Sequence, residues 1–113
     1  VIDSGQAFKV IYAENDDMAK GAVAALDKAN ISHGVGKDVI VMGFDCNKWA
    51  LEELLNQNWN YDGQCNPYQA SYIEDVIKKL ESGEKIDEKT IIMDEKGFDA
   101  TTITQDDVDQ FGI

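Results

Sequence analysis

A short apolar run that turns directly into a helical pattern is the feature that most constrains this chain. The run Val10–Ala13 contains β-branched and aromatic residues and predicts a buried strand. Asn15 and Asp16 follow it and can accept hydrogen bonds from the free N–H groups of a first helical turn. Apolar residues then recur at helical spacing from Met18 to Leu26. Such a strand-to-helix switch with polar residues at the joint is where open α/β sheets bind ligands.

The rest of the chain repeats this alternation. Its pattern predicts strands at about 9–13, 38–44, 59–65 and 90–93, and helices at about 17–29, 48–57, 67–82 and after Thr104. The unbroken apolar run Val39–Met42 is typical of a strand covered on both faces. Strict alternation predicts an α/β fold in which a parallel sheet is joined by right-handed helical crossovers.

Capping signals indicate where three of these helices begin. Asn47 can cap the second helix, and Asn66 with Pro67 predicts the start of the third, because asparagine caps and proline suits the first helical position. Thr104 and Asp107 have the spacing of a capping box.

Composition excludes several classes of function. The 113 residues carry a formal charge of −12 and no arginine, which argues against direct binding of nucleic acid. No apolar run is long enough to span a membrane. Cys46 and Cys65 form no C-x-x-C pair, and the single His33 leaves too few ligands for zinc. No glycine-rich phosphate loop or nucleophile–base pair is visible, so we expect no cofactor, no metal and no enzymatic activity.

Two motifs resemble signatures of a known family. The stretch A-E-N-D-D-M-A-K-G-A at 13–22 resembles the A-x-N-D-x-M-A-x-G-A motif of ribose- and galactose-type periplasmic binding proteins, and D-V-I-V-M-G-F-D at 38–45 resembles their next strand. An N-P helix start and a K-L-E-S-G-E-K helix end follow in the family's order, so the resemblance covers the whole chain. It implies a type I periplasmic binding protein, whose lobes are Rossmann- or flavodoxin-like sheets flanked by helices.

The resemblance also implies that the chain is a fragment. Members of the family have two lobes joined by three crossings, and residues 1–113 would form part of the C-terminal lobe, with a hinge crossing near 64–67. The predicted third helix would then lack the lobe it packs on in the family. Its apolar face, formed by Ile73, Val76, Ile77 and Leu80, would be exposed. Either this helix folds back onto its own sheet or the fragment self-associates through that face, and of the two we expect self-association.

Site residues follow from the resemblance position by position. Asn15 holds the place of the family's sugar-binding asparagine, and Asp45 holds the place of its sugar-binding aspartate. Cys65 stands where the family has a glutamine, and the adjacent Asn66 either caps or binds, so this third contact is open. Trp49 could line the sugar cleft or pack in the core. Asp16 is expected to act only as a cap.

The resemblance implies the solute-binding component of a sugar ABC importer. The protein would close two lobes around a monosaccharide, deliver it to a permease, and work outside the cytoplasm, in the periplasm or as a cell-surface lipoprotein. The alternative is the effector domain of a lactose-repressor-like transcription regulator, which shares the fold and both motifs. The stretch Asn58–Pro67 lacks the proline- and threonine-rich pattern of those regulators. A phosphoacceptor of flavodoxin-like shape, with Asp45 as nucleophile, is the third interpretation.

Overall fold

The computed structural model describes residues 1–87 and 89–113, which form two compact units. The first unit contains Val1–Cys65 and Lys96–Ile113, and the second contains Asn66–Glu95. The first unit begins with a short 3-10 helix at Ile2–Ser4. Its further elements are β1 (Val10–Tyr12), α1 (Asp16–Lys28), β2 (Ile40–Asp45), α2 (Lys48–Leu55), β3 (Tyr61–Gln64), β4 (Gly97–Asp99) and α4 (Gln105–Phe111).

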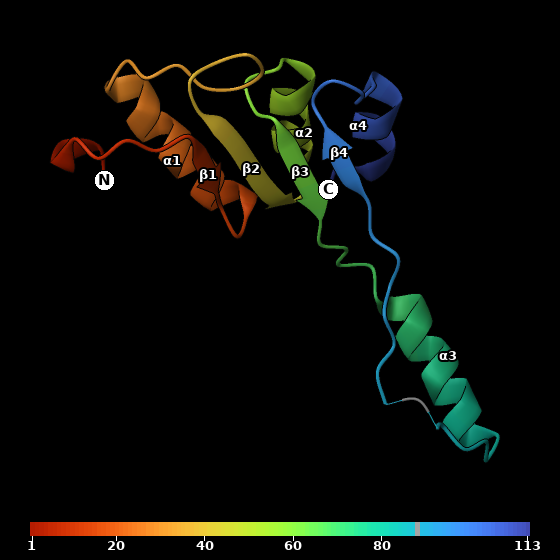
Figure 1. Cartoon of the computed structure of the whole chain (residues 1–113). Helices are drawn as coiled ribbons and strands as arrows, with labels where there is room; N and C mark the ends of the chain where they lie inside the picture. The colour runs from red at the N-terminus through yellow and green to blue at the C-terminus, as the bar shows by residue number, and fades with distance from the viewer. Residues whose placement is uncertain (88) are drawn as a thin grey trace. The chain divides into compact units, whose positions relative to one another are not determined.

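The strands form one sheet in the order β1-β2-β3-β4 (Figure 1). β1 pairs with β2 and β2 with β3 in parallel, as the alternating pattern predicts. When successive parallel strands are added in the same direction across a sheet, right-handed crossovers place their helices on the same face of that sheet. Accordingly α1, α2 and α4 lie on one side of the sheet in Figure 1. The α/β fold class predicted from the sequence is confirmed.

The fourth strand differs from the prediction. The structure places no strand at 90–93, and β4 instead spans Gly97–Asp99 and runs antiparallel to β3. Ile91 and Ile92 are exposed and lie in the second unit, whereas Phe98 is buried and packs against Phe111 with ring centroids 5.4 Å apart. Burial of this aromatic side chain in the first unit therefore decides the strand, and local β propensity does not.

The core lies between the sheet and its helices. Its largest fully buried apolar side chains come from α1, α2, α4, β2 and the segments before β2 and β3: Leu26, Val39, Val41, Leu51, Leu54, Trp59 and Val108. The predicted capping box at Thr104 and Asp107 is present and starts α4, which places Val108 in this core. Burying such side chains is the main stabilising contribution to a domain of this size.

The opposite face of the sheet is open. Side chains alternate along β2, so that Val41 is buried while Ile40 is 42% exposed. On β1, Val10 and Tyr12 are 49% and 64% exposed. The expectation that β2 is covered on both faces is therefore wrong for this structure, because α1, α2 and α4 all pack on the same side.

The second unit contains one helix, α3 (Ala70–Glu81). It begins later than predicted, because Asn66 Oδ1 accepts the N–H of Tyr68 at 2.8 Å in a local turn and does not cap a helix starting at Pro67. Gly83, at φ 77°, follows the helix end as predicted.

The apolar face of α3 is largely exposed. Ile73, Ile77 and Leu80 are 55%, 48% and 59% exposed, and Ile91 and Met93 of the same unit line a shallow hollow beside this helix. Self-association through this face stays a prediction. Among the described residues, none of the helices has the length and apolar character that a membrane crossing requires.

Candidate functional site

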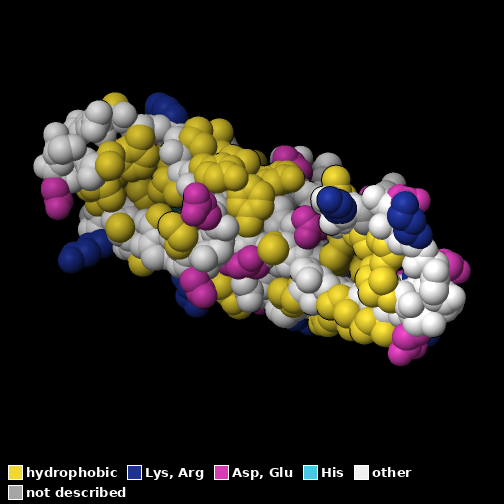
Figure 2. Space-filling model, turned by 90° about the horizontal axis from the view of Figure 1, so that it is seen from below, with side chains coloured by type: hydrophobic (Ala, Val, Ile, Leu, Met, Phe, Trp, Pro, Cys, Tyr) yellow, Lys and Arg dark blue, Asp and Glu magenta, His cyan; other side chains and the backbone are white. Residues whose placement is uncertain are grey.

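The carboxyl ends of β1, β2 and β3 meet at one edge of the sheet, where Asn15 follows β1 and Asp45 ends β2. The Ala13 N–H donates to Met42 O at 3.0 Å, which extends the β1–β2 pairing to the residues just before Asn15. Asp45 at the end of β2 is the pairing partner of Gln64 at the end of β3. Figure 2, seen from below Figure 1, shows acidic side chains lying among hydrophobic ones. This edge is where parallel sheets expose groups to a ligand.

Asn15 is the N-cap of α1. Its backbone is extended, and its Oδ1 accepts the Met18 N–H at 2.8 Å. Within the described residues the Nδ2 amide of this half-buried side chain has no hydrogen-bond partner, so its two N–H groups are free to donate. Capping and ligand binding, the two interpretations that the sequence left open, are therefore compatible.

Asp45 ends β2 in an unusual backbone conformation. Its φ is 130° and that of Cys46 is 62°, two successive residues in a region that side chains other than glycine seldom adopt. The chain end supports this bend, because the Ile113 N–H donates to Cys46 O and the Lys48 N–H donates to Ile113 O, each at 3.0 Å. The half-buried Asp45 carboxylate accepts no hydrogen bond from the described residues and is available to a ligand.

Asp16 does not cap α1, which corrects the sequence-based expectation. It is the first helical residue, it is fully buried, and its Oδ2 accepts both the backbone N–H of Asn47 at 2.8 Å and the Asn47 Nδ2 at 3.1 Å. Asn47 in turn stands at the start of α2 but makes no side-chain cap, because its amide is used in this bond. Asp16 therefore ties the start of α1 to the loop that carries Asp45.

Asp62 on β3 is a second buried carboxyl group, which the sequence motifs do not single out. It is fully buried and pairs with Gly43 in the β2–β3 register. Burial, and after it the nearby Asp16 carboxylate, raise its pKa from 3.8 to about 8. Burial also raises the pKa of Asp16, while hydrogen bonds from Asn47 and Asp62 lower it. An aspartate inside the predicted strand at 59–65 is the signal that could have identified Asp62.

Gly43 provides the space that the side chains of Asp16 and Trp59 occupy. A Cβ at this position would lie 2.5 Å from Asp16 Oδ1 and 2.8 Å from Cζ3 of Trp59. Glycine in the middle of a strand is otherwise unfavourable, so its presence here marks a close approach between β2 and the start of α1. The G in the G-F-D motif thus has a steric explanation.

The remaining predicted site residues have mixed surroundings. Trp49 is half-buried, packs edge-on against Trp59 with centroids 5.9 Å apart, and has the Lys20 ammonium 4.5 Å from its ring centroid. Cys65 is exposed at the end of the first unit, and no disulfide joins it to the buried Cys46. The Asn66 N–H donates to Glu95 Oε1 at 2.8 Å within the second unit. Ligand contacts by these residues stay predictions.

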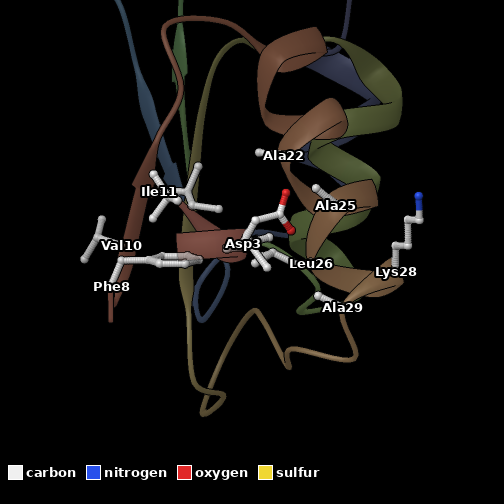
Figure 3. A pocket seen from close by; sticks show the side chains of 11 residues that line it. Asp3, Phe8, Val10, Ile11, Ala22, Ala25, Leu26, Lys28 and Ala29 are labelled. Carbon is white, nitrogen blue, oxygen red and sulfur yellow. The ribbon is translucent and has the colours of Figure 1, made fainter. Parts of the chain in front are cut away.

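A larger hollow lies elsewhere in the first unit. It is about 730 Å³ and is formed by the 3-10 helix, β1 and the C-terminal half of α1 (Figure 3). Its lining is mainly apolar, with Phe8, Ile11 and Leu26 pointing toward it and Asp3 the acidic side chain among the labelled residues. α1 begins at the carboxyl edge of the sheet, so its last residues lie roughly 20 Å from Asn15. The described residues contain no group of three or more His, Cys, Asp or Glu side chains that could hold a metal ion.

Comparison with known proteins identifies relatives that bind sugars. No family model matches the chain. The chain is 33% identical over 92 residues to the fructose import binding protein FruE of Bifidobacterium longum. The matched region covers 81% of this chain and 27% of that protein. A solved structure from Mycobacterium smegmatis in complex with β-D-fucofuranose shares 28% identity and a TM-score of 0.74, over 88% of this chain and 32% of that one.

A third relative is the periplasmic binding protein of the arabinose ABC transporter from Shewanella sp. ANA-3, solved with L-arabinofuranose. It shares 26% identity and a TM-score of 0.78 with the chain, over 89% of this chain and 33% of that one. The predicted resemblance to sugar-binding periplasmic proteins is thus confirmed. The chain spans about a quarter of the curated relative and about a third of the two solved structures.

Proposed function

We propose that this chain is part of the C-terminal lobe of the solute-binding component of a sugar ABC importer, with a hinge crossing near 64–67. The complete protein would bind a monosaccharide between two lobes, outside the cytoplasm, and deliver it to a membrane permease without chemical change. Relatives that are named for sugar import or solved with bound sugars support this proposal. The alternative, a regulator's effector domain, receives no support from these relatives.

The observation that carries the proposal is the pair of unengaged polar groups at the carboxyl edge. Asn15 offers two N–H donors, and Asp45 offers carboxylate acceptors. Sugar hydroxyls both donate and accept, and a carboxylate forms strong charge-assisted bonds to them. We place the sugar against these two residues. Trp49, with Lys20 over its ring, is assigned to packing between α1 and α2 in this proposal.

The sugar is best identified with the complete protein. In a thermal-shift screen against fructose, ribose, arabinose and galactose, at least one sugar should raise the melting temperature of the protein. A ligand that binds only the folded state stabilises that state. The absence of any shift at millimolar concentrations, in a protein shown to be folded, would contradict a sugar-binding function.

The two proposed contacts can be tested with the sugar so identified. Asn15→Ala and Asp45→Ala should each weaken its binding by roughly 1.5–3 kcal/mol, as expected for hydrogen bonds that involve charged or paired groups. Calorimetry on folded variants measures this loss. Asp17→Ala, which removes an exposed carboxylate two residues from Asn15, is the matched control and should bind normally. Unchanged binding in both site variants would place the sugar elsewhere.

A further inference from the structure

The two buried carboxyl groups, Asp16 and Asp62, have one oxygen each that no conventional donor reaches. Asp16 Oδ1 and Asp62 Oδ2 are both buried without a hydrogen-bond donor in the described structure. Asp62 lies beside Gly43 in the β2–β3 register, and Asp16 Oδ1 lies over the same glycine. A buried, ionised oxygen without a partner is costly. The two side chains interact with each other, and their oxygens satisfy each other if a single proton lies between them.

We propose that Asp16 and Asp62 share one proton beside Gly43, and that this acid pair positions the loop that carries Asp45. Asp62 holds the proton and donates it to Asp16 Oδ1. Asp16 stays ionised and uses Oδ2 to hold both N–H donors of Asn47. The pair thereby joins the segment after β2 and the interior of β3 to the start of α1. Asp62 is a positioning residue, since it acts on the loop through Asp16 and Asn47.

The surrounding charges agree with a shared proton. Asp45 is an additional negative group that raises the pKa of both aspartates, and the backbone N–H of Cys46 lowers that of Asp62. The Cys46 thiol lies 4.0 Å from Asp62 Oδ1. No lysine or histidine of the described residues contributes to either shift. Without a neighbouring cation, holding one proton is the way to avoid two like charges in a buried site.

The raised pKa of Asp62 makes the stability of the folded protein depend on pH. The pKa of Asp62 rises from 3.8 to about 8, so the folded protein keeps a proton that the unfolded chain releases near pH 4. The contribution of the pair to stability is complete below that pH, decreases as pH rises, and is lost as pH passes about 8. Above that pH, two buried charges face each other and the Asn47 contact is expected to loosen.

The shared proton can be tested without any sugar. In the complete protein with ¹³C-labelled aspartate, one side-chain carboxyl resonance should titrate near pH 8, and the ¹⁵N resonance of the Asn47 amide should shift with it. Asp62→Asn should remove both transitions, because its amide donates to Asp16 as the protonated acid does. Asp17→Asn, on the exposed side of α1, should leave both unchanged. Titration of every aspartate below pH 6 would overturn the proposal.

The effect of the acid pair on Asp45 rests on the proposed function. It is measured through sugar affinity, separately from the NMR titration. Affinity for the sugar found in the thermal-shift screen should fall by up to tenfold per pH unit above pH 8, since one proton is involved. Asp62→Asn should abolish this fall. An identical pH profile in both proteins would overturn the positioning role. Failure of every sugar to bind, with the NMR transitions present, would contradict the proposed function and support the acid pair alone.

Discussion

Replacing Asp16 with alanine should lower the free energy of unfolding by about 3–5 kcal/mol, because two hydrogen bonds to a buried charged acceptor are lost, each worth about 1.5–3 kcal/mol. The change leaves the N–H and Nδ2 groups of Asn47 without their acceptor, and it leaves the buried carboxyl group of Asp62 without its partner. Replacing a residue that only caps α1 would lower the free energy of unfolding by about 1 kcal/mol. The size of the effect therefore distinguishes the two roles.

Urea denaturation of the variant measures this loss. Asp17→Ala is the matched control, because Asp17 is an exposed neighbour in the same helical turn and should cost under about 1 kcal/mol through the helix dipole. If Asp16→Ala and Asp17→Ala destabilise the protein equally, the buried network contributes nothing beyond the helix terminus.

Replacing Gly43 with alanine should cost about 3 kcal/mol, at the upper end of the range for overpacking a core. The new methyl group would stand 2.5 Å from Asp16 Oδ1 and 2.8 Å from the Trp59 ring. Both neighbours are fully buried and have little room to move. The substitution should also displace Asp16 from Asp62 and so weaken the pH dependence of stability.

Gly21→Ala provides the control for the Gly43 variant. Gly21 lies within α1, and a Cβ there would meet nothing within 4 Å. Alanine is the better helix former, so this variant should be more stable by about 0.5–1 kcal/mol. Comparing the two melting curves isolates the steric effect at Gly43. A Gly43→Ala protein as stable as the parent would show that the space over β2 is not needed.

The strand-to-helix order was predictable because it depends on local patterns. The first three strands, the four helices and the capping box at Thr104 follow from apolar periodicity and from capping residues, and these are encoded within a few positions of each other. The edge that carries Asn15 and Asp45 then follows from the parallel sheet. Local pattern could not predict β4, because Phe98 is buried by Phe111 and other residues distant in sequence.

The acid pair illustrates what local pattern could not show. The position of Asp16 after a strand predicts a cap, yet its side chain turns inward to Asn47, 31 positions away in the sequence. Asp62 lies on β3, beside Gly43 of β2. The need for glycine at position 43 becomes clear only from the position of the Asp16 side chain. The start of α3 was misplaced for the reverse reason, since the turn at Asn66 satisfies its side chain locally. Contacts of this kind depend on packing and cannot be inferred from spacing.

The most direct test of the account is a structure of the complete protein with the sugar found in the screen. We expect a sugar hydroxyl within hydrogen-bond distance of Asn15 Nδ2 and another within that distance of an Asp45 carboxylate oxygen, at the carboxyl edge of β1 and β2. A sugar bound away from this edge, for example in the hollow beside β1 and the C-terminal half of α1, would contradict the central claim.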